Sequence, residues 1–424
     1  MTLKWHATLK SFGQLYIFLI AFYIFTLTVS CLLPSHFIRY NISKSFDRFY
    51  SEGVYPSPIL HSPFAMQDNY TDAVMLNTAY NIDNFNPFIS AISAKQSNTG
   101  QPLESLAATV KNPETNSTFS YYPRYWHGYL IVLRPLLCFF DYMEIRQINI
   151  ALILGLFATL AAVSYKSYGF KAAFSLVMGL ILVNIIVVPF SIQFMSVFVI
   201  SLLATIIILA RENLDSYWFS RALFVSGSLT AFLDLLTAPV LTLCFPLLAI
   251  LILYEKKNPI LDFHSGLRLL LLLSASWFFG YFLTWLAKWI IVYMYALDDG
   301  VVSAIKYRLG LLDEKSVAYK VVEKNIAQIG RFIMITLIII LMLLRLQPNR
   351  QKDSPMTKLY LICACIPWVW YMALSNHSYI HYWFTYRAQA ATISGMLLAM
   401  DIRGLRIKEW KDRLLKFRGY LAQS

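Results

Sequence analysis

The sequence predicts an all-α polytopic membrane protein with about ten transmembrane helices. Hydrophobic residues make up 58% of the 424-residue chain, its mean hydropathy is +0.55, and only 14% of its residues are charged. Soluble domains carry roughly 25% charged residues, so the chain length is a guide to the number of helices rather than of soluble domains. Much of the net charge of +13 lies between apolar runs and in the tail. Basic residues between apolar runs and in a tail are typical of the loops of a membrane protein and of its contacts with lipid headgroups. Nucleic acid is therefore not expected as the partner.

The spanning helices are predicted from apolar runs near the length that crosses a bilayer, about 20 residues. The ten runs lie at 13–34, 148–165, 172–189, 191–210, 222–237, 239–254, 269–295, 332–347, 357–374 and 388–402. The first run is a membrane helix rather than a signal peptide, because it has full spanning length and no small-residue cleavage site follows it.

Basic residues in the short connections set the predicted orientation. Lys4 and Lys10 precede the first helix, and alternate connections such as 255–268 are rich in Lys and Arg. The N-terminus and the C-terminus are therefore expected in the cytoplasm. The basic segment 296–331 falls on the outer side and is an exception. Short loops and the lack of a eukaryotic retention signal favour a bacterial plasma (inner) membrane.

The topology divides the chain into six segments. They are the N-terminal cytoplasmic end and helix one (1–34), a first outer loop with juxtamembrane helices (35–147), helices two to seven (148–295), a second outer segment (296–331), helices eight to ten (332–402) and a basic cytoplasmic tail (403–424). Within the first outer loop, apolar spacing predicts a helix over 71–80, capped by Thr71 or Asp72. The stretch 93–120 is predicted to be a mobile loop.

Three polar clusters lie on the outer side of this topology, where ionisable groups are costly and are functional candidates. They are Asp68 with Asp72, Asp234 at the end of an apolar run, and a hairpin over 375–387 that holds His377, His381 and Arg387.

The two acidic clusters also have ordinary structural interpretations. Asp68 and Asp72 are suited to capping a helix start, where free N–H groups and the positive dipole end favour a carboxylate. Asp234 is suited to bonding with Thr237 and the turn that follows.

The hairpin residues have structural alternatives as well. His377 and His381 share a helix face but lack a third metal ligand nearby in sequence, so boundary histidines are favoured over a metal site. Arg387 fits either an interfacial anchor or bidentate binding of a phosphate.

The stretch "YYPRYWHGYLIVLRPLLCFFDYMEIRQINIALILGLFATLAAVSYKSYGFKAAF" resembles the membrane glycosyltransferases of the GT-C fold, which include protein O-mannosyltransferases and aminoarabinose transferases. In that family a long outer loop ends in an amphipathic segment, followed by a short linker with Glu and Arg and then helix two. The matching positions are Tyr122, Pro123 and Tyr125 in the segment and Glu144 and Arg146 in the linker. In layout the resemblance covers about residues 1–255.

The resemblance implies that a sugar passes from a polyprenyl phosphate to a lipid-linked or cell-envelope acceptor on the outer face, by an inverting displacement with a carboxylate base. The best match to the family's acidic motif is "QDNYTDAVML", which makes Asp68 or Asp72 the expected base; Asp47 is a poorer match. The loop has no Asp-Glu or Asp-Asp pair, which departs from the family pattern. The expected substrate-binding residues are Arg387, His377, His381, Arg124, His127, Asp234 and Tyr70.

No cofactor is required by this mechanism. If a divalent cation takes part, Asp298 and Asp299 are the expected additional ligands, because they lie on the same side of the membrane. The expected partners are the lipid bilayer, the donor and the acceptor.

Two other classes compete with this interpretation. A lipid-linked polysaccharide polymerase or ligase also uses outer Arg and His residues, but its largest outer loop usually comes late in the chain. A transporter or flippase would have to use Lys288, the main charge deep in a predicted helix, and no internal repeat supports it. A non-catalytic relative with the same frame is the remaining alternative.

Overall fold

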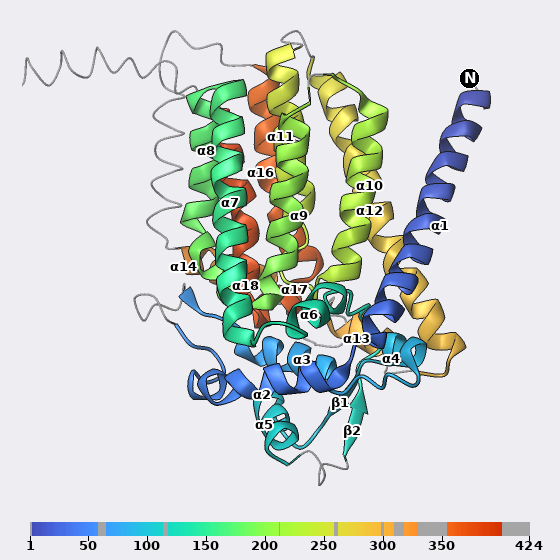
Figure 1. Cartoon of the computed structure of the whole chain (residues 1–424). Helices are drawn as coiled ribbons and strands as arrows, with labels where there is room; N and C mark the ends of the chain where they lie inside the picture. Colours follow the sequence, from blue (N-terminus) through green and yellow to red (C-terminus); the bar gives the residue numbers. More distant parts are fainter. Residues whose placement is uncertain are drawn as a thin grey trace, which may run out of the picture.

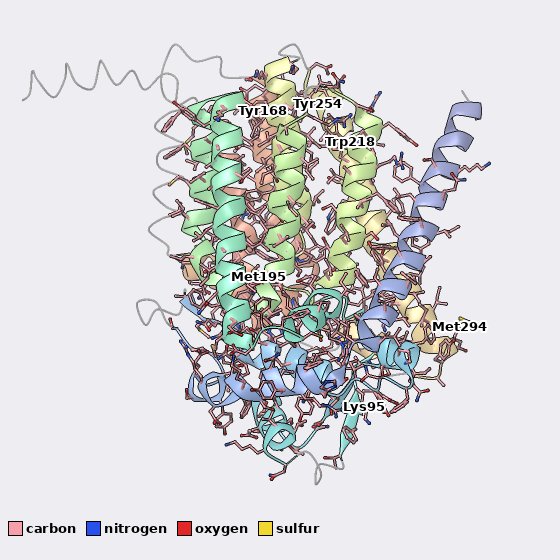
Figure 2. The ribbon with its side chains drawn as sticks, viewed as in Figure 1. Lys95, Tyr168, Met195, Trp218, Tyr254 and Met294 are labelled. Atoms are coloured by element: carbon pink, nitrogen blue, oxygen red, sulfur yellow. The ribbon has the colours of Figure 1, made fainter. Side chains whose placement is uncertain are left out.

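The computed structural model describes residues 2–57, 65–112, 118–211, 213–257, 262–297, 301–308, 318–329 and 354–400. In this part of the chain, long helices stand side by side and a layer of short helices lies across one end of them (Figure 1). We call this layer the cap layer and the two ends of the long helices the cap end and the opposite end. Lys95 lies in the cap layer, whereas Tyr168, Trp218 and Tyr254 lie at the opposite end (Figure 2).

The long helices agree with an all-α membrane protein. They are α1 (Thr2–Leu32), α7 (Tyr142–Tyr168), α8 (Phe170–Leu182), α9 (Ile192–Leu209), α10 (Ser216–Leu233), α11 (Leu241–Lys257), α12 (Phe263–Met294), α16 (Pro355–Ala373) and α19 (Gln389–Ala399). By length and composition, 5 helices of the described residues can cross a membrane, namely α1, α7, α9, α12 and α16. The predicted helix 332–347 lies outside the described residues. Ten spans therefore remain a prediction.

Two of the predicted helices end earlier than expected. The helix predicted over 172–189 stops at Leu182, because Asn184 takes a left-handed conformation with φ of 57° and a 3₁₀ turn follows, η2 (Ile185–Phe190). Asparagine is one of the few residues that tolerates this conformation. The helix predicted over 222–237 stops at Leu233, so Asp234 lies in the turn after the helix rather than inside it.

The cap layer is formed by most of the predicted first outer loop. It contains α2 (Ser35–Ser51), α3 (Asn69–Tyr80), α4 (Pro87–Ser93), β1 (Lys95–Ser97), α5 (Pro102–Lys111), β2 (Phe119–Tyr121) and α6 (Leu130–Leu137). The helix predicted over 71–80 is confirmed by α3, but the predicted cap is wrong: α3 begins two residues earlier and its N-cap is Asp68 rather than Thr71 or Asp72.

The mobile loop predicted over 93–120 is wrong for the described residues of that stretch. β1 and β2 pair antiparallel with Gln96 opposite Ser120, and α5 lies between them in sequence. A capping box between Gln101 and Glu104, with Pro102 in the first turn, starts α5. This combination is a helix-start signal that the sequence carried.

The predicted hairpin 375–387 is a series of short helices, α17 (Ser375–Ile380), α18 (Tyr382–Thr385) and η3 (Tyr386–Ala388). Helices α13 (Val301–Arg308) and α14 (Ala318–Ile329), from the predicted second outer segment, pack against α17. The two segments therefore lie together at the cap end.

Two buried cations fasten the cap layer to the long helices. Arg134 of α6 is fully buried, and its guanidinium donates to the carbonyl oxygens of Ser30, Ala79 and Leu33 at 2.6–2.8 Å. Lys288 of α12 is also fully buried, and its Nζ donates to the carbonyl oxygen of Ile92 in the last turn of α4 at 2.7 Å. A cation is favoured at this end of a helix.

Candidate functional site

A cavity of about 770 Å³ lies between the cap layer and the short helices at the cap end. Most of its wall comes from α3, the β1–β2 and α5 region, α13, and α17 with α18, and Tyr55, Arg124, Gln193 and Leu235 are among the residues that complete it. The charged or histidine side chains among its lining residues are Asp68, Arg124, Arg308, His377 and His381. Two of the three predicted polar clusters thus contribute to one cavity, the first through Asp68 and the third through His377 and His381.

Asp68 is the only carboxylate that lines this cavity among the described residues. It is the N-cap of α3 and accepts hydrogen bonds from Thr71 N at 2.9 Å and Thr71 Oγ1 at 3.0 Å. Burial, together with a smaller effect of the neighbouring Asp72, raises the pKa of this carboxyl to about 7, although the bonds from Thr71 and the charge of Arg387 oppose the rise. Asp68 therefore both caps α3 and carries a carboxyl whose pKa lies near neutral pH.

Asp72 lies one turn further along α3 and has a different environment. It is fully buried and is not among the residues that line the cavity. Its carboxylate accepts hydrogen bonds from the Tyr142 hydroxyl and from the backbone N–H groups of Ile192 and Gln193, the first residues of α9. These contacts cap α9 and join it to α3, so the geometry favours a structural role for Asp72 and leaves Asp68 as the candidate base.

His377 of α17 and His381, which lies between α17 and α18, line the cavity as neutral imidazoles. Their ring centroids are 4.8 Å apart, and His377 Nε2 lies 2.9 Å from the carbonyl oxygen of Leu236. Burial and the positive charge of Arg308 lower the pKa of His381 to about 4, and burial also lowers the pKa of His377 well below its usual value. Neutral imidazoles offer hydrogen bonds to a bound molecule without adding charge.

Two arginines supply the positive charge of the cavity, each against a tyrosine ring. Arg124 lies over the ring of Tyr122 at 4.8 Å, and Arg308 lies over the ring of Tyr125 at 5.2 Å. Arg308 also donates from Nη2 to the Tyr125 hydroxyl at 2.6 Å. Within the described residues no carboxylate lies at ion-pair distance from Arg308. From the sequence, Arg308 is distinguishable only as one residue of the basic segment 296–331, because its partner Tyr125 is 183 residues away.

Arg387 is fully buried and is not among the lining residues of the cavity. Its guanidinium lies 4.3 Å from the centre of the Phe194 ring and donates to the carbonyl oxygens of Trp383 and Met66 at 3.2 and 3.3 Å. Met66 precedes Asp68 by two residues, and the positive charge of Arg387 lowers the pKa of the Asp68 carboxyl. This geometry fits a residue that positions Asp68 better than one that contacts a phosphate.

Two further predicted site residues, His127 and Asp234, do not line the cavity. His127 is buried, with Nδ1 3.0 Å from the Tyr129 hydroxyl and Nε2 2.7 Å from the Tyr122 carbonyl oxygen, so neither ring nitrogen is left for a phosphate. Asp234 is buried behind the cavity and accepts from Thr237 N at 2.9 Å. This bond agrees with the structural interpretation of Asp234.

Tyr70 lines the cavity and belongs to an aromatic group at its rim. Its ring stacks on Tyr55 with centroids 6.3 Å apart, and Tyr55 meets Trp383 edge to face at 5.3 Å. The exposed fraction of Tyr70 is 36%. Its ring therefore offers a flat, accessible surface beside Asp68.

Several buried polar atoms of the lining residues have no hydrogen-bond partner in the described part of the chain. They are Ser97 Oγ, Gln193 Oε1, His381 Nδ1 and Trp383 Nε1. Buried polar groups in native proteins are nearly always bonded, so each exception calls for an explanation. A bound polar molecule in the cavity would supply the missing partners.

Metal ligation has no candidate in the residues that the structure covers, since no group of three or more His, Cys, Asp or Glu side chains is close enough to hold an ion. Asp298 and Asp299, the expected additional ligands, lie outside those residues.

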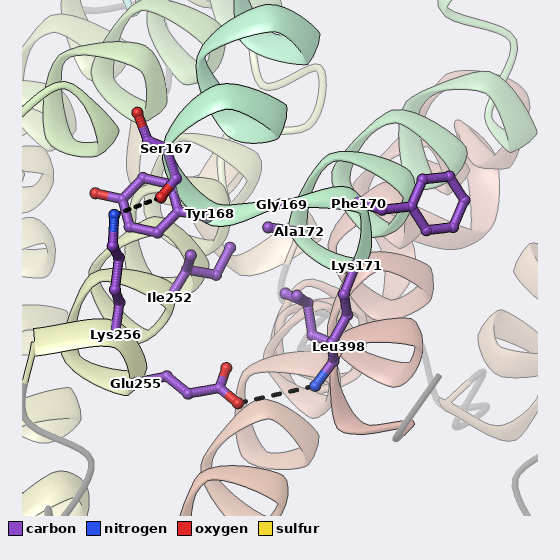
Figure 3. Close-up of a pocket in the computed structure, with 10 residues that line it drawn as sticks. All are labelled: Ser167, Tyr168, Gly169, Phe170, Lys171, Ala172, Ile252, Glu255, Lys256 and Leu398. Carbon is purple, nitrogen blue, oxygen red and sulfur yellow. Dashed lines mark hydrogen bonds and ion pairs between the residues drawn. The ribbon is translucent and has the colours of Figure 1, made fainter. Parts of the chain in front are cut away.

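A second hollow, of about 680 Å³, lies at the opposite end between α7, α8 and α11 (Figure 3). Its charged groups are already engaged with the protein. Lys256 Nζ donates to the carbonyl oxygen of Ser167 at 2.6 Å, and Lys171 lies 3.9 Å from Glu255. These contacts tie helix ends together and leave this hollow without the unpaired polar groups that mark the cap-end cavity.

The fold and the cavity define a helical membrane protein with a basic, aromatic-lined site at one end. Comparison with known proteins adds no relative, because no protein family matches the chain and neither a curated protein nor a solved structure is similar to it.

Proposed function

We propose that the protein is a membrane glycosyltransferase that moves a sugar from a polyprenyl-phosphate donor to an acceptor at the outer face of the membrane. The observation that carries the proposal is the meeting of one carboxylate, two arginines and two neutral histidines around a single cavity at the end of the long helices. Those groups come from four separate segments of the chain.

Asp68 is the base in this mechanism. Its carboxylate takes the proton of the acceptor hydroxyl while the acceptor oxygen attacks the anomeric carbon of the donor sugar. The bond between that carbon and the phosphate oxygen breaks, and its electron pair leaves with the phosphate. One base and one leaving group imply inversion at the anomeric carbon. A pKa of about 7 suits a base that works near neutral pH.

Arg124 and Arg308 hold the phosphate. Their charge opposes the negative charge that develops on the leaving group, and such fixed electrostatic stabilisation is often the largest contribution to catalysis. His377 and His381 add hydrogen bonds from the same wall. Arg387 acts through Asp68, whose segment it holds in place.

The cavity also suits a lipid-linked donor. Beside the phosphate-binding residues its lining includes the apolar side chains of Leu235, Ile380 and Phe384, which can contact the first isoprene units. A position at the end of the apolar helices leaves the lipid tail in the bilayer while the headgroup enters the cavity.

The transporter alternative loses its main support, because Lys288 holds α4 rather than standing free along a path. A polymerase or ligase acting on a polyprenyl diphosphate would use the same basic wall. No feature of the described residues favours it over a transferase.

The test of the donor assignment is the binding of polyprenyl phosphate itself. Wild-type protein in lipid nanodiscs should retain polyprenyl phosphate in preference to phosphatidic acid, measured by mass spectrometry of the co-purified lipids. Arg308→Ala should weaken this binding about 10- to 100-fold, as expected for losing charge-assisted hydrogen bonds.

Arg268→Ala is the matched control, because Arg268 is exposed near the start of α12 and distant from the cavity. Equal retention of the two lipids by the wild type, or equal binding by both variants, would contradict the donor assignment.

A further inference from the structure

The cavity has a second half that the proposed mechanism does not use. This half is walled by the cap layer, and its polar lining side chains are amides and hydroxyls. They are Asn77, Gln96, Ser97, Asn98, Gln101 and Ser105. No Asp, Arg or His side chain lines the cavity between Tyr70 and Tyr121; Asp68 precedes this stretch and Arg124 follows it. The cavity is therefore divided into a charged half and a neutral half.

Helix α3 connects the two halves. Asp68, at its N-cap, and then Thr71, Val74 and Asn77 all line the cavity, about one residue for each successive turn of the helix. With a rise of about 1.5 Å per residue, Asn77 lies about 14 Å along the helix from Asp68. The neutral half thus begins at the base and extends further than one sugar ring.

The β1–β2 pair keeps charge out of this half. Gln96 and Ser120 pair across the two strands and both line the cavity. Lys95 is the next residue along the strand, and its Nζ lies 3.8 Å from the centre of the Phe119 ring, outside this cavity.

The neutral half also has unused hydrogen-bonding capacity. Ser97 Oγ is buried without a partner among the described residues, and so is Gln193 Oε1 at the inner wall. Tyr121, with 55% of its surface exposed, adds an aromatic face at the outer edge. Amides, hydroxyls and an accessible ring, with no charge, are suited to hydroxylated rings without charge.

We infer that the neutral half is the acceptor subsite and that the acceptor is an uncharged carbohydrate chain. The inference rests on the proposed function. The chain lies along α3 and β1 and presents one hydroxyl to Asp68, which takes its proton as the oxygen bonds to the donor sugar. An amine or a basic peptide would need further carboxylates here, and an acidic glycan would need cations. The neutral half has neither.

The experiment uses the full-length protein in nanodiscs with a polyprenyl-phosphate donor labelled in the sugar. Envelope glycans and glycolipids from the native cells are separated by ion exchange into neutral, anionic and cationic fractions, and each is offered as acceptor. Label is expected in the neutral fraction alone, and periodate treatment of that fraction should abolish its uptake.

Two variants place the acceptor on the strand. Gln96→Ala should raise the KM for the neutral fraction about tenfold, the effect of losing one net hydrogen bond, while polyprenyl phosphate retention stays at the wild-type level. Lys95→Ala, at the neighbouring position of the same strand but outside the cavity lining, should leave the KM unchanged.

Label in a charged fraction, or an unchanged KM in Gln96→Ala, would overturn the inference while leaving the transferase assignment intact. A wild type that neither retains polyprenyl phosphate nor releases sugar from the donor would overturn both.

Discussion

At the scale of single residues, Asp68 and Asp72 show how different surroundings separate two similar buried side chains. They are four positions apart on one short helix. Asp68 faces a cavity, whereas Asp72 meets the N-terminus of α9, about 120 residues further along the chain. The sequence singled out both residues, but it had no means to distinguish them, because the deciding partner comes from a distant helix.

Asp72→Asn should therefore destabilise the protein. The substitution replaces a carboxylate oxygen by an amide nitrogen and leaves a backbone N–H of α9 or the Tyr142 hydroxyl without an acceptor. The free energy of unfolding is expected to fall by about 1–3 kcal/mol, seen as a lower Tm in detergent. An unchanged Tm would contradict the capping role.

The arginines show the same limit of sequence reasoning. Arg387 was expected at the phosphate because it is a lone cation in an apolar region. In the structure it is enclosed by Phe194 and two carbonyl oxygens. Arg308 was not predicted as a site residue, because it belongs to a basic segment. In the structure it lines the cavity and donates a hydrogen bond to the Tyr125 hydroxyl. Charge and spacing in the sequence placed the candidate residues at the end of the molecule where the cavity lies. They could not identify which guanidinium faces that cavity.

At the scale of elements, the closest packing is between α10 and α12. A Cβ added at Gly227 would lie 2.1 Å from the carbonyl oxygen of Trp277, and one added at Gly280 would lie 2.0 Å from that of Phe224. Small residues of this kind let membrane helices approach closely. The packing of α10 against α12 positions the turn after α10. This turn contains Asp234 and also Leu236, whose carbonyl oxygen contacts His377 Nε2.

Gly280→Ala should force α10 and α12 apart, because the obstacle is backbone rather than a flexible side chain. Overpacking of this kind typically costs about 1–3 kcal/mol, and the Tm in detergent should fall accordingly. Gly155→Ala in α7 is the control, since a Cβ there meets nothing within 4 Å. Equal Tm values for the two variants would show that the helices are not tightly joined here.

Elements were predictable where a strong local signal exists. The apolar runs located most of the long helices within a few residues, and apolar spacing located α3. The strands β1 and β2 are three residues each and depend on one another across the connecting α5. Such short strands have no periodicity of their own, so a polar sequence there looked like a loop.

At the scale of the whole molecule, the cap layer closes one end of the helices and makes the two ends chemically different (Figure 1). The distribution of basic residues predicts that the cap layer faces outward. The proposed donor depends on this orientation, because the resemblance to the GT-C family implies that the sugar is transferred on the outer face.

Cysteine labelling tests the orientation with two exposed lysines, one at each end. Lys111→Cys on α5 should react with a membrane-impermeant maleimide in intact cells, and Lys257→Cys at the end of α11 should react only after permeabilisation. The unsubstituted protein provides the background from its own cysteines. The reverse labelling pattern would place the cap layer in the cytoplasm.

The account depends most on the role of Asp68, and the most direct measurement is the rate at which sugar leaves a labelled polyprenyl-phosphate donor. Asp68→Asn should lower that rate about 10²- to 10⁴-fold. Asp47→Asn, an exposed position in the same cap layer, should retain the wild-type rate.

The wild-type rate should also rise with pH through about 7 and then level off, because the Asp68 carboxyl must lose its proton before it can accept one. Full activity of Asp68→Asn at every pH would contradict the proposed mechanism.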